Sequence, residues 1–196
     1  MIANERLLFF TNLLNDVPIE EVINLFAKAS EKHLRAGEEY ISDNEINKKL
    51  AYIQNGVIRA YTIKQNGEEA TLLLRWDDQF VGSHDSILLQ QPSKFKYQAL
   101  EETHILEIDY AYVENIMAEN PKFEPLRNFV LMNMLSASLK MIEDFILLNP
   151  EERYKKLISE KFDIVNRVPD KYIASMLGIT PVSLSRIRKR ISSKKM

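Results

Sequence analysis

The chain of 196 residues contains no cysteine, only five glycines and only three histidines. The absence of cysteine excludes disulfides, thiolate metal sites, iron–sulfur clusters and a cysteine nucleophile, and it agrees with the reducing cytoplasm in which we expect the protein to work. No stretch approaches the ~18 consecutive apolar residues of a membrane span. The N-terminus lacks the basic segment followed by an apolar stretch that marks a signal peptide. We therefore expect no membrane association.

The residues that catalysis would need are also missing. His33, His84 and His104 are scattered, with no HxH pair and no glutamate at ligand spacing, so neither a cupin-like enzyme nor an axial haem ligand is indicated. No Gly-rich phosphate loop and no nucleophile elbow is present. We predict that the protein is not an enzyme and has no metal and no cofactor.

Charge is distributed unevenly along the chain. Residues 151–196 hold 12 Lys and Arg against 5 Asp and Glu, a net charge of +7, whereas the first 150 residues hold 14 against 23, a net charge of −9. A basic C-terminal part on an acidic body indicates that only this part contacts a polyanion. A solvated basic tail is the alternative.

The first two thirds of the chain predict a β-rich domain. Residues 4–32 have the apolar spacing of helices, interrupted at Asp16–Pro18. From Leu34 to Asp109 short strands alternate with turns, and the dipeptides Asn55-Gly56 and Asn66-Gly67 predict type I′ hairpins. The expected strands are 57–63, its partner 69–76, and further strand material in 97–108. The fold class is α+β, with an N-terminal double-stranded β-helix or jelly roll.

A long helix follows from Asn120-Pro121 to Leu148, where Asn149-Pro150 ends it. Its apolar residues form two heptad rows rather than one, so both faces must be buried. One face is expected on the β-domain and the other on a second subunit, in a homodimer formed through 121–148. Burial within a single chain is the alternative. The first row is Leu131, Leu135, Ser138, Ile142 and Phe145, and the second is Phe123, Val130, Met134, Ala137, Met141 and Leu148.

The C-terminal segment predicts a helix-turn-helix after another helix, which begins at Asn149-Pro150 and continues to about Phe162. Asp170–Leu177 forms a short helix, Gly178 is placed where a helix end needs a left-handed residue, and Thr180-Pro181 caps the next helix. The residues expected to pack the two helices together are Ile173, Ala174, Leu177, Ile179, Leu184 and Ile187.

The outward face of the second helix is polar and basic, which predicts contact with double-stranded DNA. We expect Arg186 to bond a guanine bidentately in the major groove. The other predicted DNA-contacting residues are Thr180, Val182, Ser183, Ser185, Arg188, Lys189 and Arg190. A helical hairpin with no role in DNA binding would satisfy some of the packing requirements, but it would not account for the polar and basic outward face.

A β-domain, a dimer helix and a C-terminal helix-turn-helix together resemble the Crp/Fnr family of bacterial transcription regulators, and the last segment resembles members from Bacteroides-type bacteria. The resemblance covers nearly the whole chain. It is carried by Gly37-Glu38, residues 52–59, Gly67–Glu69, Phe80–Gly82, residues 172–181 and residues 184–189. It implies a sensor domain at 1–119, a dimerisation helix at 120–148 and a DNA-binding domain at 149–196, with a palindromic operator, RNA polymerase as a further partner and a small-molecule effector that the sequence does not identify.

The resemblance also implies an effector pocket, which we assign to Gly82, Ser83, Ser93 and Lys94. Family members that bind cyclic AMP have a glutamate for the ribose and an arginine for the phosphate, and these fall at Ser83 and Ser93 here. No arginine occurs from 76 to 126, and a buried phosphate would lack its bidentate partner. We therefore predict a regulator that does not respond to cyclic AMP.

Two further departures affect the DNA-binding part. Val182 stands where many members have a glutamate that contacts cytosine, so a contact with a thymine methyl and an altered operator are expected. Residues 161–168 are few for a β wing, so we expect a reduced wing. The alternative function is a cyclic-nucleotide-domain module that binds a small molecule without specific DNA binding, and the basic C-terminal part disfavours it.

Overall fold

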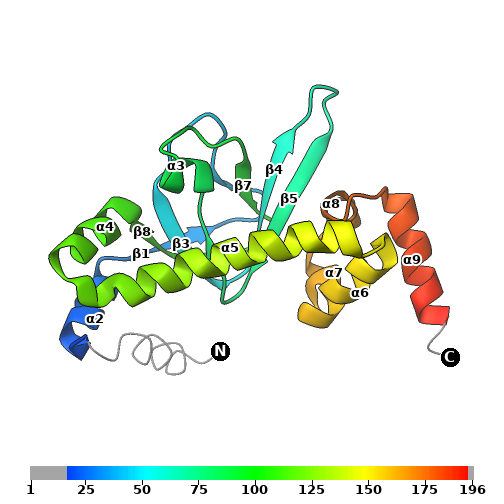
Figure 1. Ribbon diagram of the computed structural model, residues 1–196. Coiled ribbons are helices and arrows are strands. Elements are labelled where there is room, and N and C mark those ends of the chain that lie inside the picture. Colours follow the sequence, from blue (N-terminus) through cyan, green and yellow to red (C-terminus); the bar gives the residue numbers. More distant parts are fainter. Residues whose placement is uncertain (1–16, 194–196) are drawn as a thin grey trace.

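The computed structural model describes residues 17–193, which form a β-rich N-terminal domain, a long helix and a C-terminal group of helices (Figure 1). This confirms the predicted α+β fold class. The strands are β1 Ser30–Leu34, β2 Glu39–Ile41, β3 Lys49–Asn55, β4 Val57–Ile63, β5 Glu69–Trp76, β6 Phe80–Val81, β7 Lys96–Ala99 and β8 Thr103–Asp109. The helices are α2 Ile19–Ala27, α3 His84–Leu88, α4 Tyr110–Glu119, the 3₁₀ turn η1 Pro121–Phe123, α5 Glu124–Leu147, α6 Pro150–Glu160, α7 Ile164–Arg167, α8 Asp170–Met176 and α9 Pro181–Ser193.

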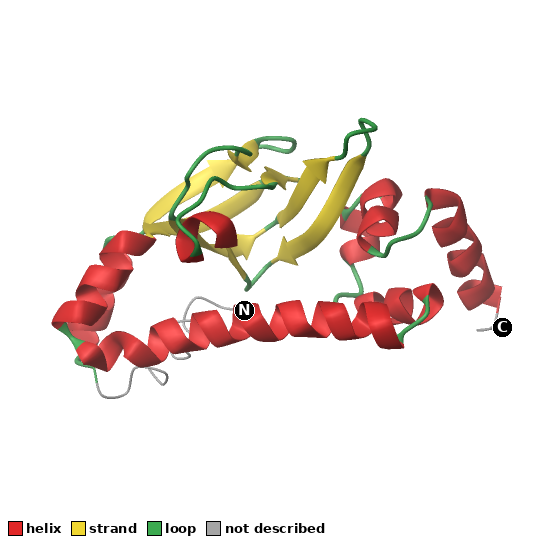
Figure 2. Ribbon diagram, turned by 45° about the horizontal axis from the view of Figure 1, so that its top comes forward, coloured by secondary structure: helices red, strands yellow, loops and turns green. Residues whose placement is uncertain are grey.

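Two four-stranded sheets form the β-roll (Figure 2). One has the strand order β1-β8-β3-β6 and the other β2-β7-β4-β5, and all pairs in the two sheets are antiparallel. Ile53 on β3, Ile58 on β4 and Ile105 on β8 are completely buried between the sheets. Side chains of a strand alternate between its faces, so these β-branched residues fill the interior while their neighbours in sequence lie on the other face of each sheet.

The predicted strands 57–63 and 69–76 are confirmed as β4 and β5, paired from Val57 opposite Trp76 to Ile63 opposite Glu69. The turn between them contains Asn66-Gly67, as expected, but only Gly67 has a positive φ, +83°. A type I′ turn needs positive φ at both central residues, so the hairpin is closed by a different turn. Its bonds run from the Lys64 N–H to the Glu68 carbonyl and from the Gly67 N–H to the Lys64 carbonyl.

The prediction of a hairpin at Asn55-Gly56 is wrong. β3 and β4 belong to different sheets, so this dipeptide is the corner where the chain passes from one sheet to the other. Gly56 has φ +120°, and a Cβ atom there would lie 2.6 Å from the Thr103 Cβ. A glycine is therefore required by both the backbone conformation and the close approach of β8.

The ends of the β-domain also differ from the prediction. The helix expected over 4–32 ends at Ala27 in α2, because residues 30–34 pair with β8 as strand β1. The other apolar residues of that prediction, Leu7, Leu8, Leu13 and Leu14, lie outside the described residues. The strand material at 97–108 is divided into β7 and β8. The helices α3 and α4 were not predicted, because their short apolar patterns are not distinguishable from those of strands.

The long helix begins and ends where the sequence predicted. Asn120 caps η1 by accepting from the Lys122 N–H, α5 follows to Leu147, and Asn149 caps α6 in a capping box with Glu152. Phe123 and Leu126 at the start of α5 pack with α4 and the β-roll. The segment expected to form a reduced wing contains helix α7, and no strand follows Asp109 within residues 17–193.

Ion pairs connect the C-terminal helices to the β-roll at Asp77, which follows β5. Asp77 accepts hydrogen bonds from both terminal nitrogens of Arg167 (2.7 and 3.0 Å), from Lys161 (2.9 Å) and from the Gly56 N–H (2.8 Å). Arg167 also bonds Glu101 at 2.6 Å. Burial alone would raise the pKa of the Asp77 carboxyl, but these hydrogen bonds outweigh it and hold the pKa well below its usual range.

This ion-pair cluster predicts loss of stability in acid. An aspartate whose pKa is lowered in the folded state stabilises it fully above the unfolded pKa of about 3.9. This contribution is lost progressively as the pH falls from that value through the lowered folded-state pKa. We expect Asp77→Asn to lower the free energy of unfolding by about 2 kcal/mol at pH 7 and by clearly less near pH 2, where the folded-state carboxylate is closer to its own pKa. Denaturant titrations at both pH values measure this. An equal loss at the two pH values would show that the charge of Asp77 is not responsible.

Candidate nucleic-acid interface and effector segment

The two helices α8 and α9 form a helix-turn-helix whose turn depends on Gly178. Gly178 has φ +70°, and its N–H bonds the Ser175 carbonyl while the Ile179 N–H bonds the Ala174 carbonyl at 2.9 Å. These bonds complete the C-terminus of α8 in the way that a left-handed glycine permits. The turn is also fitted to the long helix, because a Cβ at 178 would lie 3.0 Å from a ring carbon of Phe145.

The start of α9 and its inner face are formed as expected from the sequence. The Thr180 hydroxyl accepts from the Ser183 N–H at 3.1 Å, which is the N-cap bond, and Pro181 is the first helical residue. Leu184 and Ala174 are completely buried where the two helices cross, so the outer face of α9 has a fixed orientation relative to α8.

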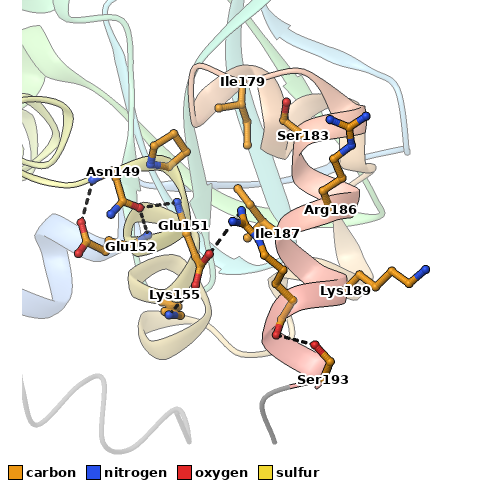
Figure 3. A pocket seen from close by; sticks show the side chains of 12 residues that line it. Asn149, Glu151, Glu152, Lys155, Ile179, Ser183, Arg186, Ile187, Lys189 and Ser193 are labelled. Carbon is orange, nitrogen blue, oxygen red and sulfur yellow. Dashed lines mark hydrogen bonds and ion pairs between the residues drawn. The ribbon is translucent and has the colours of Figure 1, made fainter.

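The outer face of α9 carries four of the predicted DNA-contacting residues. Val182 is 62% exposed, and Ser185, Arg186 and Lys189 are exposed as well. Figure 3 shows Arg186 and Lys189 extending from α9 away from α6. Within residues 17–193, neither side chain forms an ion pair or a hydrogen bond, so both charges are available to an external partner.

A groove of about 1030 Å³ separates α9 from the first turn of α6 (Figure 3). On its α6 side Glu151 pairs with Lys155 at 2.8 Å and with Arg190 of α9 at 3.4 Å. An acidic first turn does not suit a phosphate group, since carboxylates repel it. Arg186, Lys189 and Arg190 line the α9 side of this groove, and Arg190 is the one that pairs with Glu151.

Arg188, which the sequence groups with the phosphate-contacting residues, lies on the inner side of α9. Its guanidinium pairs with Asp170 of α8 at 2.7 Å and donates to the Tyr154 hydroxyl of α6 at 3.1 Å. These contacts connect three helices of the C-terminal group. Sequence spacing does not reveal them, because the partners are 18 and 34 residues away.

The four residues of the predicted effector pocket lie on both sides of α3. Ser83 is buried and caps α3 by accepting from the Ser86 N–H at 3.3 Å, while the buried Ser93 donates to the Phe95 carbonyl at 2.7 Å. Gly82 is needed for packing, since a Cβ there would lie 2.8 Å from Ile87. The Lys94 side chain is 69% exposed.

Asp85 lies in the same segment, residues 82–94, and was not among the predicted pocket residues. It is 1% exposed, and one carboxylate oxygen accepts from the Lys94 N–H at 3.1 Å. The other has no hydrogen bond but lies 3.7 Å from the Lys94 Nζ and 3.6 Å from the His84 Nε2. Burial, together with the charge of Asp85 and against that of Arg75, raises the pKa of Tyr97 to about 12. The buried region beside α3 therefore contains a carboxylate. The position of Asp85 in the sequence, shortly after Gly82, could have indicated it.

The histidines are less scattered than the sequence suggested. His33 and His104 are opposite each other on β1 and β8, with their rings stacked at 4.4 Å. Within residues 17–193, no group of three or more His, Cys, Asp or Glu side chains is arranged to hold a metal ion, and no helix is long and apolar enough to cross a membrane.

Comparison with known proteins matches the β-roll to a family profile and most of the chain to regulatory proteins. The family profile of the cyclic nucleotide-binding domain matches residues 31–120. The chain is 25% identical to the fumarate and nitrate reduction regulatory protein of Vibrio cholerae, over 89% of this chain and 72% of that protein. It is also 25% identical to the anaerobic regulatory protein of Pasteurella multocida, over 91% and 68% of the two chains. These relatives are regulatory proteins rather than enzymes.

Solved structures share the fold at lower sequence identity. FixK2 from Bradyrhizobium japonicum superposes with a TM-score of 0.69 at 18% identity, covering 85% of this chain and 86% of that one. The c-di-GMP-responsive global regulator CLP of Xanthomonas campestris has a TM-score of 0.68 at 12% identity, covering 91% and 93%. The arrangement of a β-roll, a long helix and a C-terminal helix-turn-helix is therefore common to all three.

Proposed function

We propose that this chain is a sequence-specific transcription regulator of the Crp/Fnr type that binds double-stranded DNA. In this proposal residues 1–119 are the sensor domain, 120–148 the dimerisation helix and 149–196 the DNA-binding domain. The observation that carries it is the outer face of α9, where Arg186 and Lys189 extend without partners among residues 17–193 beside the exposed Val182.

The chemistry of this face suits the major groove. An arginine at the N-terminal half of such a helix bonds the O6 and N7 atoms of guanine, and the methyl groups of valine contact the thymine methyl. We assign base contacts to Arg186, Val182 and Ser185. Thr180, Ser183 and Lys189 are assigned to phosphates, which fix the register but carry little sequence information. Arg190 joins them once it leaves Glu151, and Arg188 acts by holding α9 in place.

A homodimer through α5 completes the proposal, because a palindromic operator needs two copies of α9. α5 exposes an apolar stripe at alternating spacings of three and four residues, which is the seam of a two-stranded coiled coil. The stripe consists of Met132 (59% exposed), Leu135 (52%), Leu139 (50%), Ile142 (53%) and Ile146 (75%). RNA polymerase is a proposed further partner.

Selection of bound sequences from a random pool of double-stranded DNA tests the function. We expect enrichment of one palindromic sequence with two identical half-sites, and a parallel selection with cell-extract metabolites reveals an effector. Recovery of unenriched sequences at low salt only, together with binding of a metabolite, would instead identify a small-molecule-binding module without specific DNA binding.

We further propose that the effector is not cyclic AMP. Ser93 occupies the position of the phosphate-binding arginine, and the buried carboxylate of Asp85 adds negative charge to the same segment. A cyclic phosphate would be buried without a guanidinium and next to a like charge, both of which oppose binding.

Calorimetric titration with cyclic AMP and cyclic GMP is expected to show no binding up to millimolar nucleotide. The Asp85→Asn variant, which removes the like charge, is expected to show none either, because the arginine is still missing. Binding by Asp85→Asn alone would assign the exclusion to Asp85, and micromolar binding by the wild-type protein would contradict the proposal.

A further inference from the structure

Arg59 on β4 is a charged residue with 1% of its surface exposed, and the β-roll supplies all its hydrogen bonds. Its Nε and Nη2 donate to the Gln98 side-chain carbonyl of β7 at 3.0 and 2.8 Å, and its Nη1 pairs with Glu69 of β5 at 2.7 Å. These three contacts hold the guanidinium plane in one orientation.

The two faces of this guanidinium are covered by aromatic rings from different parts of the protein. The Tyr61 ring of β4 lies 3.8 Å from the guanidinium carbon, and the Tyr172 ring of α8 lies 3.6 Å from it. A cation between two rings, removed from water, is a strong and geometrically specific contact. We call these three residues the Arg59 clamp. Tyr172 is its only member from the helix-turn-helix.

A second contact lies beside the clamp. The Ser175 hydroxyl of α8 accepts from the Thr71 N–H of β5 at 2.9 Å. β5 is an edge strand, and Figure 1 shows α8 next to it. Thus α8 has two packing faces. Ile173 and Ala174 belong to a buried cluster that the C-terminal helices share with Val57 and Leu74 of the β-roll. Tyr172 and Ser175 contact Arg59 and Thr71 of the β-roll.

The clamp is important because the backbone between α5 and α6 does not by itself fix the direction of the C-terminal helices relative to α5. Leu148 and Asn149 join α5 to α6 with extended backbone, at ψ 138° and 166°, so the direction of the C-terminal helices relative to α5 depends on side-chain contacts. The ion-pair cluster at Asp77 attaches α7 to the β-roll, and Lys156 pairs with Asp144 of α5 at 2.7 Å. The clamp at Tyr172 adds an attachment on α8, the helix that packs directly against α9. The helix α9 follows α8 as one packed unit.

We propose that the Arg59 clamp fixes the orientation of α9 relative to α5 and thereby sets the half-site spacing that the dimer accepts. The inference rests on the proposed DNA-binding function. Tyr172 acts as a positioning residue, since it holds the DNA-contacting helix without being on its outer face.

A series of operators with one to four base pairs inserted between the half-sites tests the spacing. We expect the wild-type protein to lose at least about tenfold in affinity for one inserted base pair, because each rotates the second half-site by about a tenth of a helical turn. Tyr172→Ala is expected to lose less than about threefold across one or two insertions, while its affinity for a single half-site is unchanged. Tyr172→Phe keeps the ring and should behave as wild type.

A measurement without DNA separates this inference from the proposed function. Since the chain has no cysteine, spin labels can be placed at Glu45→Cys and Ser192→Cys, which are both exposed. The distance distribution is expected to be narrow in wild type and broad in Tyr172→Ala and in Arg59→Lys, which keeps the charge but loses the planar face. A narrow distribution and a sharp spacing optimum in Tyr172→Ala would overturn the inference. A wild-type protein with a narrow distribution and no specific operator would overturn the proposed function alone.

Discussion

The double substitution Leu139→Glu and Ile142→Glu is expected to make the protein monomeric and to reduce operator affinity at least a hundredfold. Both side chains are about half exposed in the middle of the apolar stripe of α5. In a two-stranded coiled coil each would face its own copy, so the substitution places four carboxylates in one interface. A monomer contacts one half-site at a time and loses the 10²- to 10⁴-fold gain from joining two binding units.

Light scattering after gel filtration measures the oligomeric state, and a fluorescence titration with labelled operator measures affinity. Lys140→Gln is the matched control, since Lys140 is exposed on the same helix but off the stripe. The control is expected to remain a dimer with unchanged operator affinity. A double variant that remains dimeric would mean that the subunits associate through another surface, and α5 would then lose its proposed role.

The sequence predicted best those elements whose ends are encoded locally. Asn120, Asn149 and Thr180 cap helices in the structure because a side-chain oxygen needs only the next three amides as partners. Gly178 likewise depends on its own φ. These four residues give most of the boundaries of the C-terminal part.

The elements that were missed depend on contacts far along the chain. Asn55-Gly56 has the letters of a hairpin, but the approach of Thr103 at this position makes it a corner between sheets. The sequence also could not show which apolar side of α5 is exposed. The first predicted row shares Leu135 and Ile142 with the exposed stripe, and its Phe145 is also 46% exposed, whereas the second row shares no residue with the stripe. The covered side of α5 is set by the packing of Leu126, Phe129 and Met134 against the core cluster.

The candidate site shows the same distinction between features encoded locally and features that depend on distant contacts. Arg186, Arg188 and Arg190 are equivalent as sequence, and each was assigned to DNA. In the structure Arg188 is used within the C-terminal helices and Arg190 pairs with Glu151, so only Arg186 among the three has no partner in residues 17–193. Which basic residues of a helix remain available is determined by the acidic residues of its neighbours, and these come together only in the fold.

The remaining large effect concerns Arg186 itself. We expect Arg186→Ala to reduce the preference for the selected operator over random DNA by about 5- to 150-fold, the range that corresponds to 1–3 kcal/mol for a bidentate contact with guanine. Non-specific binding at low salt is expected to change far less, because Lys189, Arg190 and the helix N-terminus still contact phosphates.

Lys189→Ala is the matched control, because it removes one positive charge from the same exposed face. It is expected to weaken binding to operator and random DNA by the same factor and to reduce the slope of log affinity against log salt by about 1. Arg186→Ala should instead lose affinity for the operator selectively. The loss should also disappear on an operator whose guanine is replaced, since the arginine then has no bidentate partner in either protein. If Arg186→Ala and Lys189→Ala show the same uniform weakening, Arg186 contacts phosphate, and the base-specific contact has to be sought at Val182 or Ser185.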